Sequence, residues 1–98
     1  MPSTDASGPL VRPSPRVTFQ QIGDETVLLD LDTEQYYSLD GIGARVWQWI
    51  VEGLAPHEIE SRLIDGYDAT PETIRADLAS LLRQLEGAGL IRSNDGRP

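Results

Sequence analysis

The stretch TVLLDLDTEQYYSL, residues 26–39, decides the fold because it places two short strand patterns on either side of a polar turn. Residues 26–31 and 35–39 both show the alternation with period two that is typical of half-buried strands. Residues 32–34, Asp-Thr-Glu, supply turn chemistry between them. The pattern therefore predicts an antiparallel hairpin.

The second strand of this hairpin carries two adjacent tyrosines. Alternation puts Tyr37 and Leu39 on one face and Tyr36 and Ser38 on the other, so one ring packs inward and its neighbour is displayed. No charge, proline or bulge interrupts residues 35–39, although natural proteins commonly protect an exposed strand edge with such features. We therefore expect an open edge that can accept another peptide.

Patterns on both sides of the hairpin complete the predicted fold. Residues 16–20 (RVTFQ) alternate like a strand and precede a Gly-Asp turn, which makes the sheet a three-stranded antiparallel meander. Apolar residues at helical spacing, with capping residues and prolines at the starts, predict helices over 41–53, 56–66 and 71–86. The expected fold class is α+β: a three-stranded antiparallel sheet followed by a three-helix bundle, similar to a winged helix-turn-helix domain.

The two ends of the chain differ in composition from its middle. Residues 1–15 contain four prolines and few large apolar residues, which predicts a flexible tail because such a segment buries too little surface to offset the entropy of ordering. Residues 93–98 are polar, and we expect a frayed end there. A single domain is therefore predicted over residues 16–92.

Composition narrows the chemistry. The chain has no cysteine, no lysine and one histidine, His57, and its net charge is −8 from 16 acidic and 8 basic residues. These counts exclude thiolate zinc sites, multi-histidine metal sites and cysteine nucleophiles. We expect no catalytic residue, no metal and no cofactor, with His57 on the surface. Because there is no secretory signal and no apolar run near the roughly 20 residues of a membrane span, we expect a cytoplasmic protein without a membrane partner.

Three classes of function can be compared on these grounds. An enzyme is disfavoured because the sequence has no nucleophile–base set, calcium loop or phosphate-binding glycine loop. DNA binding is disfavoured because the third helix offers only Arg75 and Arg83, against three acidic residues, to a phosphate backbone. The acidic excess in the middle of the chain favours a basic partner, or serves only solubility. Recognition of an extended peptide by strand addition is the preferred class.

The apolar stripes of the helices suggest where such a peptide lies. The first helix presents Ile42, Val46, Trp49 and Ile50, with Trp47 beside them. The third helix presents Ile74, Leu78, Leu81 and Leu85, flanked by Arg75, Ala79, Leu82 and Glu86. Leu82 is either part of a wide core stripe or one wall of a groove beside the open strand, and the spacing alone leaves both readings open.

Two runs of this sequence resemble the protein D family of pyrroloquinoline quinone biosynthesis: VLLDLDTEQYYSLDGIGARVWQWIVEG (27–53) and YDATPETIRADLASLLRQLEGAGLI (67–91). This family is the founding case of the recognition elements in pathways to ribosomally synthesised and post-translationally modified peptides (RiPPs). The run GIGARVW after a paired-tyrosine strand is most similar to the stand-alone leader-binding B1 proteins of lasso-peptide pathways. Asp40 stands where Asn is commoner in the family, but both residues cap helices.

The resemblance implies that the chain binds the leader segment of a precursor peptide by β-strand addition and presents it to a leader peptidase and a cyclase. Such leaders tend to be basic and to carry a Tyr-x-x-Pro pattern. A recognition protein of another RiPP pathway, such as that of pyrroloquinoline quinone, is the first alternative, and a DNA-binding winged-helix protein is a more distant one. A homodimer through the open edge also remains compatible with the sequence.

The resemblance also implies a set of peptide-binding residues, contributed by the strands and by the third helix. On the strands they are Leu28, Asp30, Tyr36, Tyr37, Ser38 and Leu39. On the third helix they are Arg75, Leu78, Ala79 and Leu82. No catalytic residue and no metal ligand belongs to this expected site, and nucleic acid is not expected as a partner.

Overall fold

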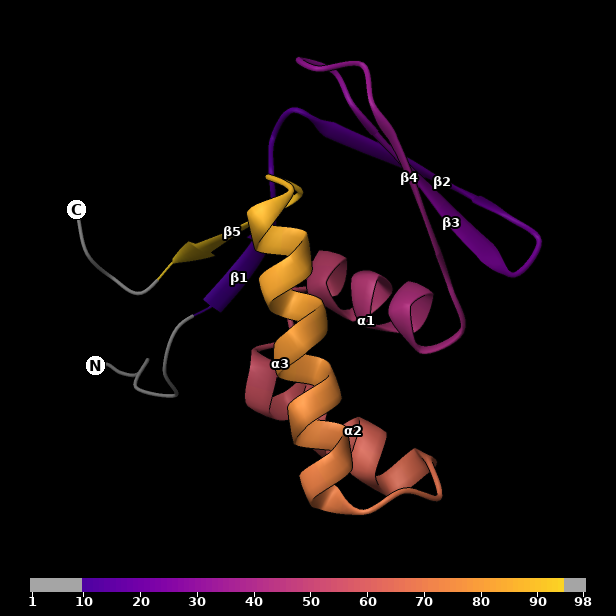
Figure 1. Cartoon of the computed structure of the whole chain (residues 1–98), viewed down its shortest axis with the longest axis vertical. Helices are drawn as coiled ribbons and strands as arrows, with labels where there is room; N and C mark the ends of the chain where they lie inside the picture. The colour runs from indigo at the N-terminus through magenta and orange to yellow at the C-terminus, as the bar shows by residue number, and fades with distance from the viewer. Residues whose placement is uncertain (1–9, 95–98) are drawn as a thin grey trace.

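The computed structural model describes residues 10–94, which form two small sheets and three helices. In chain order the elements are β1 (Leu10–Pro13), β2 (Val17–Ile22), β3 (Glu25–Asp30), β4 (Tyr36–Asp40), α1 (Gly41–Glu52), α2 (Pro56–Gly66), α3 (Pro71–Gly87) and β5 (Ile91–Asn94). In Figure 1, α3 stands across the molecule, with the β1–β5 ribbon on one side and the other three strands on the opposite side. The α+β class and the three-stranded antiparallel sheet with three helices are confirmed.

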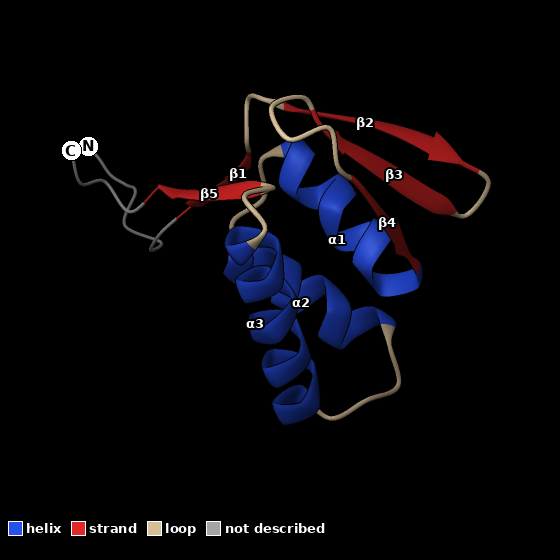
Figure 2. Cartoon of the chain, turned by 45° about the horizontal axis from the view of Figure 1, so that its top comes forward, coloured by secondary structure: helices blue, strands red, loops and turns tan. Residues whose placement is uncertain are grey.

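The sheet of β2, β3 and β4 is an antiparallel meander with β3 in its centre. Its first hairpin turns at Gly23, whose φ of 63° suits a residue without a side chain. In the second hairpin, Leu28 pairs with Tyr37 and Thr26 pairs with Leu39. Figure 2 shows α1 lying beneath this sheet, so the helices cover only one of its faces.

The core forms where α1 meets the sheet and the other two helices. Leu28 and Trp47 are fully buried, and the Phe19 ring packs edge-on against Trp47 with the ring centroids 5.7 Å apart. The sequence predicted Trp49 in the apolar stripe of α1, but Trp49 is only half-buried and lies under the guanidinium of Arg62. The prediction therefore favoured the wrong tryptophan for the core. Both rings lie near the apolar stripe of α1, and only contact with the sheet determines that Trp47 is the buried one.

The helix ends follow the predicted signals in part. At the start of α3, the Thr70 hydroxyl accepts a hydrogen bond from the Thr73 N–H at 3.2 Å. At the end of α1, Gly53 adopts a left-handed conformation with φ 94°. Asp40 occupies the N-cap position of α1 with an extended backbone, yet its side chain makes no capping hydrogen bond. Its carboxylate is therefore exposed at the end of β4.

The described part of the chain begins earlier and ends later than the predicted domain. Residues 10–13 form β1, which pairs antiparallel with β5, and the Ser14 N–H donates to the Leu90 carbonyl at 2.9 Å. The predicted tail over residues 1–15 therefore does not hold for residues 10–15, because Val11 and Ile91 are buried together in the core. Residues 93 and 94 belong to the predicted frayed end, but in the structure they are the last two residues of β5. The rest of both predicted ends, residues 1–9 and 95–98, lies outside the described residues.

Candidate peptide-binding site

Strand β4 is one edge of its sheet. It pairs with β3 on one side, and no other strand within residues 10–94 pairs with its outer side, because β1 and β5 pair with each other in a separate sheet. The open edge expected from the sequence is therefore present in the described part of the chain, as Figure 1 shows.

The pairing of β3 with β4 determines which backbone groups face the open edge. Asp30 N–H donates to the Gln35 carbonyl at 3.0 Å, which marks this as a hydrogen-bonded pair. Because hydrogen-bonded and non-hydrogen-bonded pairs alternate along an antiparallel ladder, Tyr37 and Leu39 direct their N–H and C=O groups toward β3. Tyr36 and Ser38 direct theirs outward. These groups are available to an added strand.

The side chains of β4 divide as the sequence predicted. Tyr36 is 72% exposed and Ser38 is also exposed, whereas Tyr37 and Leu39 are half-buried against the core. The Ser38 hydroxyl donates to Glu25 at 3.1 Å on the outer face of the sheet. β4 therefore has unpaired backbone groups along its outer edge, while one of its faces packs against the core.

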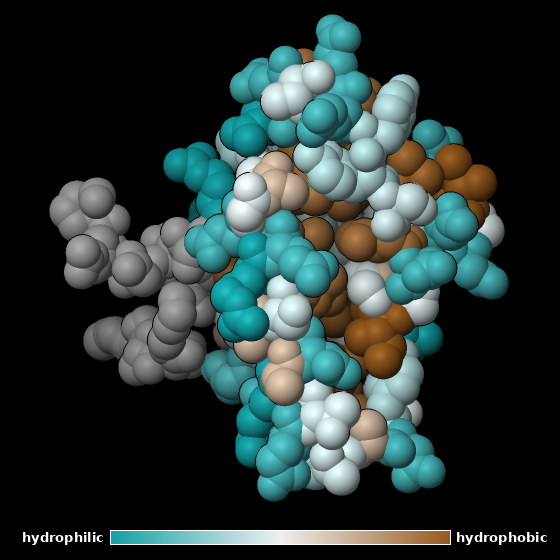
Figure 3. All heavy atoms as spheres, in the orientation of Figure 1, coloured by the Kyte–Doolittle hydropathy of each residue, from teal (hydrophilic) through white to brown (hydrophobic). Residues whose placement is uncertain are grey.

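An apolar hollow of about 280 Å³ lies among the three helices, next to the end of β4. It is lined by Ile42, Val46, Leu63, Tyr67, Asp68, Ala69, Ile74, Asp77, Leu78 and Leu81. Ile42 follows β4 almost directly, and its side chain is 46% exposed. Figure 3, in the orientation of Figure 1, shows apolar atoms gathered between the positions of α3 and β4. The hollow, or groove, thus begins in the first turn of α1, directly after the open strand, although no residue of β4 itself lines it.

Four helix residues predicted for the site do not all face this groove. Leu78 lines it, but Arg75, Ala79 and Leu82 line a second hollow, between α2 and α3, together with Pro56, His57 and Glu60. Arg75 donates from Nε to the Glu60 carboxylate at 2.8 Å, and this hydrogen bond raises the pKa of Arg75. Most of the predicted helix residues therefore lie about a third of a turn from the helix face that lines the first hollow. Asp77 and Leu81, which were not among the predicted site residues, share that face with Ile74.

Two strand residues predicted to touch the peptide lie in the interior instead. Leu28 is 0% exposed and Asp30 is 1% exposed, so neither presents a surface to an added strand. The reason is their shared face: β3 turns Thr26, Leu28 and Asp30 toward α1 and the loop before β4. The strand part of the site is therefore reduced to β4 itself.

The groove carries negative charge. Asp68 and Asp77 line the hollow, both are exposed, and neither forms an ion pair with another described residue. Asp40 lies exposed at the end of β4, beside the start of α1. An apolar floor with carboxylates along its rim suits a guest peptide that has apolar side chains and basic neighbours. The sequence contained one signal for the helical part of this site, the apolar residue Ile42, but the helical spacing alone assigned Ile42 to the core.

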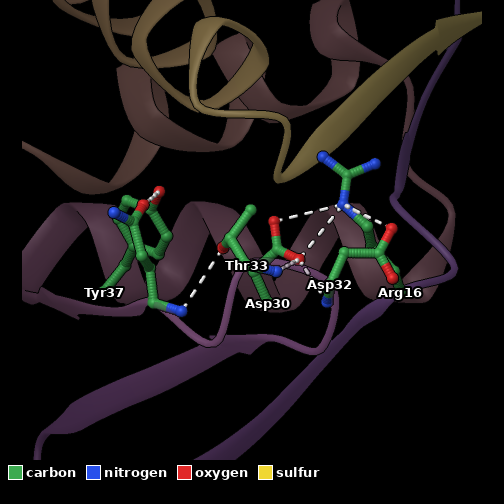
Figure 4. Close-up of polar contacts among 6 residues, drawn as sticks. Arg16, Asp30, Asp32, Thr33 and Tyr37 are labelled. Carbon is green, nitrogen blue, oxygen red and sulfur yellow. Dashed lines mark hydrogen bonds and ion pairs between the residues drawn. The ribbon is translucent and has the colours of Figure 1, made fainter.

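Asp30 holds the loop that leads into β4, and its environment shifts its pKa. Burial alone raises the pKa of this carboxyl, but the hydrogen bond from Arg16, the backbone N–H groups of Asp32 and Thr33, and the charge of Arg16 together lower it below its ordinary value. Figure 4 shows these partners gathered around the carboxylate. These contacts therefore favour the ionised form of Asp30.

This depressed pKa predicts a pH-dependent contribution to stability. A carboxyl with a lowered folded pKa stabilises the fold above its unfolded pKa, about 3.9, and that contribution disappears as the pH falls through the folded value. Asp30→Asn should therefore unfold at a lower urea concentration than the wild type at pH 7, with the difference shrinking at pH 3. Urea unfolding followed by tryptophan fluorescence measures this. A difference that stays constant between pH 7 and pH 3 contradicts the prediction.

The chain matches a known protein family over most of its described residues. The family model of Coenzyme PQQ synthesis protein D (PqqD) covers residues 25–91, from β3 to the start of β5. The chain belongs to the PqqD family. The resemblance inferred from residues 27–53 and 67–91 is thereby confirmed. No curated protein matches this PqqD-family chain.

Two solved structures resemble this PqqD-family protein over most of its length. One is TbiB1 in complex with the TbiA(beta) leader peptide, with 34% sequence identity and a TM-score of 0.80 over 89% of this chain and 98% of that one. The other is a lasso peptide synthetase B1 complexed with its leader peptide, with 24% identity and a TM-score of 0.78 over 84% of this chain and 96% of that one. The second likeness concerns the fold alone.

Among residues 10–94, no group of three His, Cys, Asp or Glu side chains is placed to hold a metal ion. None of the helices that the structure describes is long and apolar enough to cross a membrane.

Proposed function

We propose that this PqqD-family protein binds the leader segment of a ribosomally synthesised precursor peptide, which adds to β4 as a further antiparallel or parallel strand. The observation that carries the proposal is the open β4 edge beside an apolar hollow, in a chain that is 34% identical to a protein solved with a leader peptide. Strand addition draws affinity from the backbone ladder and selectivity from the pockets beside it. Tyr36 and Ser38 supply the ladder groups, and the hollow receives a guest side chain.

The role in the pathway is recognition rather than catalysis. The protein holds the leader and presents it to a leader peptidase and a cyclase of lasso-peptide biosynthesis. The rim carboxylates Asp68 and Asp77 favour a basic leader. A Tyr-x-x-Pro leader fits the same reading, since an aromatic ring suits an apolar hollow. The family match also supports a second candidate, a recognition protein of another RiPP pathway such as pyrroloquinoline quinone.

DNA binding finds less support in the arrangement of charges. The helix α3 has Arg75 paired with Glu60, and Asp77 lies on its groove face. A DNA-reading helix needs several free cations toward the phosphate backbone. A homodimer through the β4 edge remains a proposal, and it predicts that bound leader separates the two copies. Sedimentation of the protein with and without leader measures this.

Isothermal titration calorimetry tests the proposed function. The titrants are the synthetic TbiA(beta) leader, a synthetic leader from a pyrroloquinoline quinone precursor, a scrambled version of each, and a DNA duplex. We expect saturable 1:1 binding of an intact leader, weakened by added salt because the groove and the leader carry opposite charges. Binding of the duplex with no heat from either leader would refute the proposal. Which leader binds more tightly separates the lasso reading from that of another RiPP pathway.

A further inference from the structure

The side chain of Asp30 organises the loop between β3 and β4, although it cannot reach the peptide itself. Its carboxylate accepts hydrogen bonds from the N–H groups of Asp32 at 2.9 Å and Thr33 at 3.3 Å, and from Arg16 Nε at 3.1 Å. The backbone carbonyl of Asp30 accepts from the Glu34 N–H at 2.7 Å. Figure 4 shows the carboxylate between the loop and the arginine. One residue thus binds the loop through both its side chain and its backbone.

This loop delivers the chain into β4. Glu34 adopts a left-handed conformation with φ 62°, which is uncommon for a residue with a side chain and persists only where surrounding contacts hold it. The next residue, Gln35, pairs through its carbonyl with the Asp30 N–H and accepts a hydrogen bond from the Tyr37 hydroxyl at 2.9 Å through its side chain. The direction in which Tyr36 enters the edge strand is therefore set by the loop that Asp30 holds.

The arginine on the other side of Asp30 reaches the end of α3. Gly89 follows that helix with φ 78°, and a Cβ added there would overlap the Arg16 guanidinium. The backbone carbonyl of Arg16 accepts from the Leu31 N–H at 2.8 Å, which ties the arginine to the same loop. Arg16 therefore lies between the loop before β4 and the turn after α3. Neither element lines the apolar hollow itself, but the loop leads directly into the β4 edge, to which the leader is proposed to add.

We propose that the Arg16–Asp30 pair is a positioning device for the leader groove: it fixes the β3–β4 loop, and with it the β4 edge, against the C-terminal end of α3. This inference rests on the proposed function, and it names two residues that act on the leader without touching it. A charge-assisted hydrogen bond to a fully buried carboxylate is stronger than a neutral one, so it suits the fixing of a loop. If the pair contributed only to overall stability, a variant without it would bind the leader no more weakly than another variant destabilised by the same amount.

The first test compares Asp30→Ala with Asp30→Asn. Alanine removes the side-chain acceptor of the loop and keeps only the backbone carbonyl, whereas the asparagine oxygen still accepts from Asp32 and Thr33 and lacks only the charge that binds Arg16. We expect the affinity for the TbiA(beta) leader to fall by about 10-fold or more in Asp30→Ala and by about 3-fold in Asp30→Asn. Ile59→Val, a core variant with a modest stability loss, should bind the leader as the wild type does.

The second test moves the arginine without changing either member of the pair. Gly89→Ala displaces the flexible end of Arg16, and it also strains a left-handed backbone. Gly53→Ala strains an equally left-handed residue at the end of α1, where the added Cβ meets nothing within 4 Å. We expect a loss of leader affinity of about 3-fold in Gly89→Ala and none in Gly53→Ala. Equal affinities of these two variants would overturn the role of Arg16.

Hydrogen exchange of the free protein provides a readout that does not depend on any leader. If the pair positions the edge, the amides of Tyr37 and Leu39, which face β3, exchange faster in Asp30→Ala than in Ile59→Val, while amides of α2 do not. Uniformly faster exchange in both variants, or Asp30→Ala binding the leader as tightly as the wild type, overturns the inference. Should Asp30→Ala fail to fold, Asp30→Asn and the glycine pair carry the same comparison. Absence of leader binding by the wild type refutes the proposed function, whereas the exchange data still decide the positioning role.

Discussion

Replacing Ile42 by aspartate should lower the affinity for a leader peptide by at least about 30-fold while leaving the fold intact. The Ile42 side chain lines the apolar hollow and is 46% exposed in the free protein, so a carboxylate there is solvated until a guest covers it. Burying an unpaired polar or charged group costs about 2 kcal/mol or more, which is about 30-fold in affinity. Calorimetry with a leader that the wild type binds measures the loss of affinity, and circular dichroism checks the fold.

Two variants are matched controls for this result. Val51→Asp puts the same charge at an exposed site on the same helix, outside the hollow, and should leave binding unchanged. Leu82→Asp separates the two faces of α3: the family resemblance implies that Leu82 lies beside the peptide, whereas the structure places it in the hollow between α2 and α3. We expect Leu82→Asp to change leader affinity far less than Ile42→Asp. If Leu82→Asp lowers the leader affinity more than Ile42→Asp does, the peptide lies on the Arg75–Leu82 face of α3 instead.

Replacing Ser38 by proline should weaken leader binding by about 10-fold or more with only a modest loss of stability. The Ser38 N–H points to the open edge, so proline removes a donor that β3 does not use, and edge strands tolerate proline at such positions. An added strand loses one hydrogen bond, worth about 1 kcal/mol, and meets the proline ring where it must approach closely. Thermal unfolding and leader titration of the same preparation measure the two effects.

Gln21→Pro is the matched control on the opposite edge of the sheet. The Leu31 N–H donates to the Arg16 carbonyl, so by the same alternation the Gln21 N–H points away from β3. The same substitution therefore removes an edge donor from β2, which borders no part of the hollow. Equal loss of leader affinity in both proline variants would show that the peptide does not add to β4.

The sequence alone determined the three strands of the larger sheet, the three helices and the open edge. Period-two alternation in residues 26–31 and 35–39 depends only on local backbone geometry, and so does the assignment of Tyr36 outward and Tyr37 inward. Capping signals at Thr70 and Gly53 act within one helical turn, which is why the helix boundaries were predictable. The same local patterns, joined to the family resemblance, identified the strand to which we propose that a leader adds.

Only the tertiary structure decided which residues surround that strand. Three kinds of assignment depended on contacts between distant segments: the pairing of β1 with β5, the choice of Trp47 over Trp49, and the face of α3 that meets the groove. A stripe of leucines is compatible with rotations of about a third of a turn, because neighbouring positions on a helix differ in direction by only 100°. Asp30 gives the plainest case. The family resemblance implied that Asp30 contacts the peptide, but partners from two separate segments, Arg16 and the loop before β4, stabilise it inside the fold.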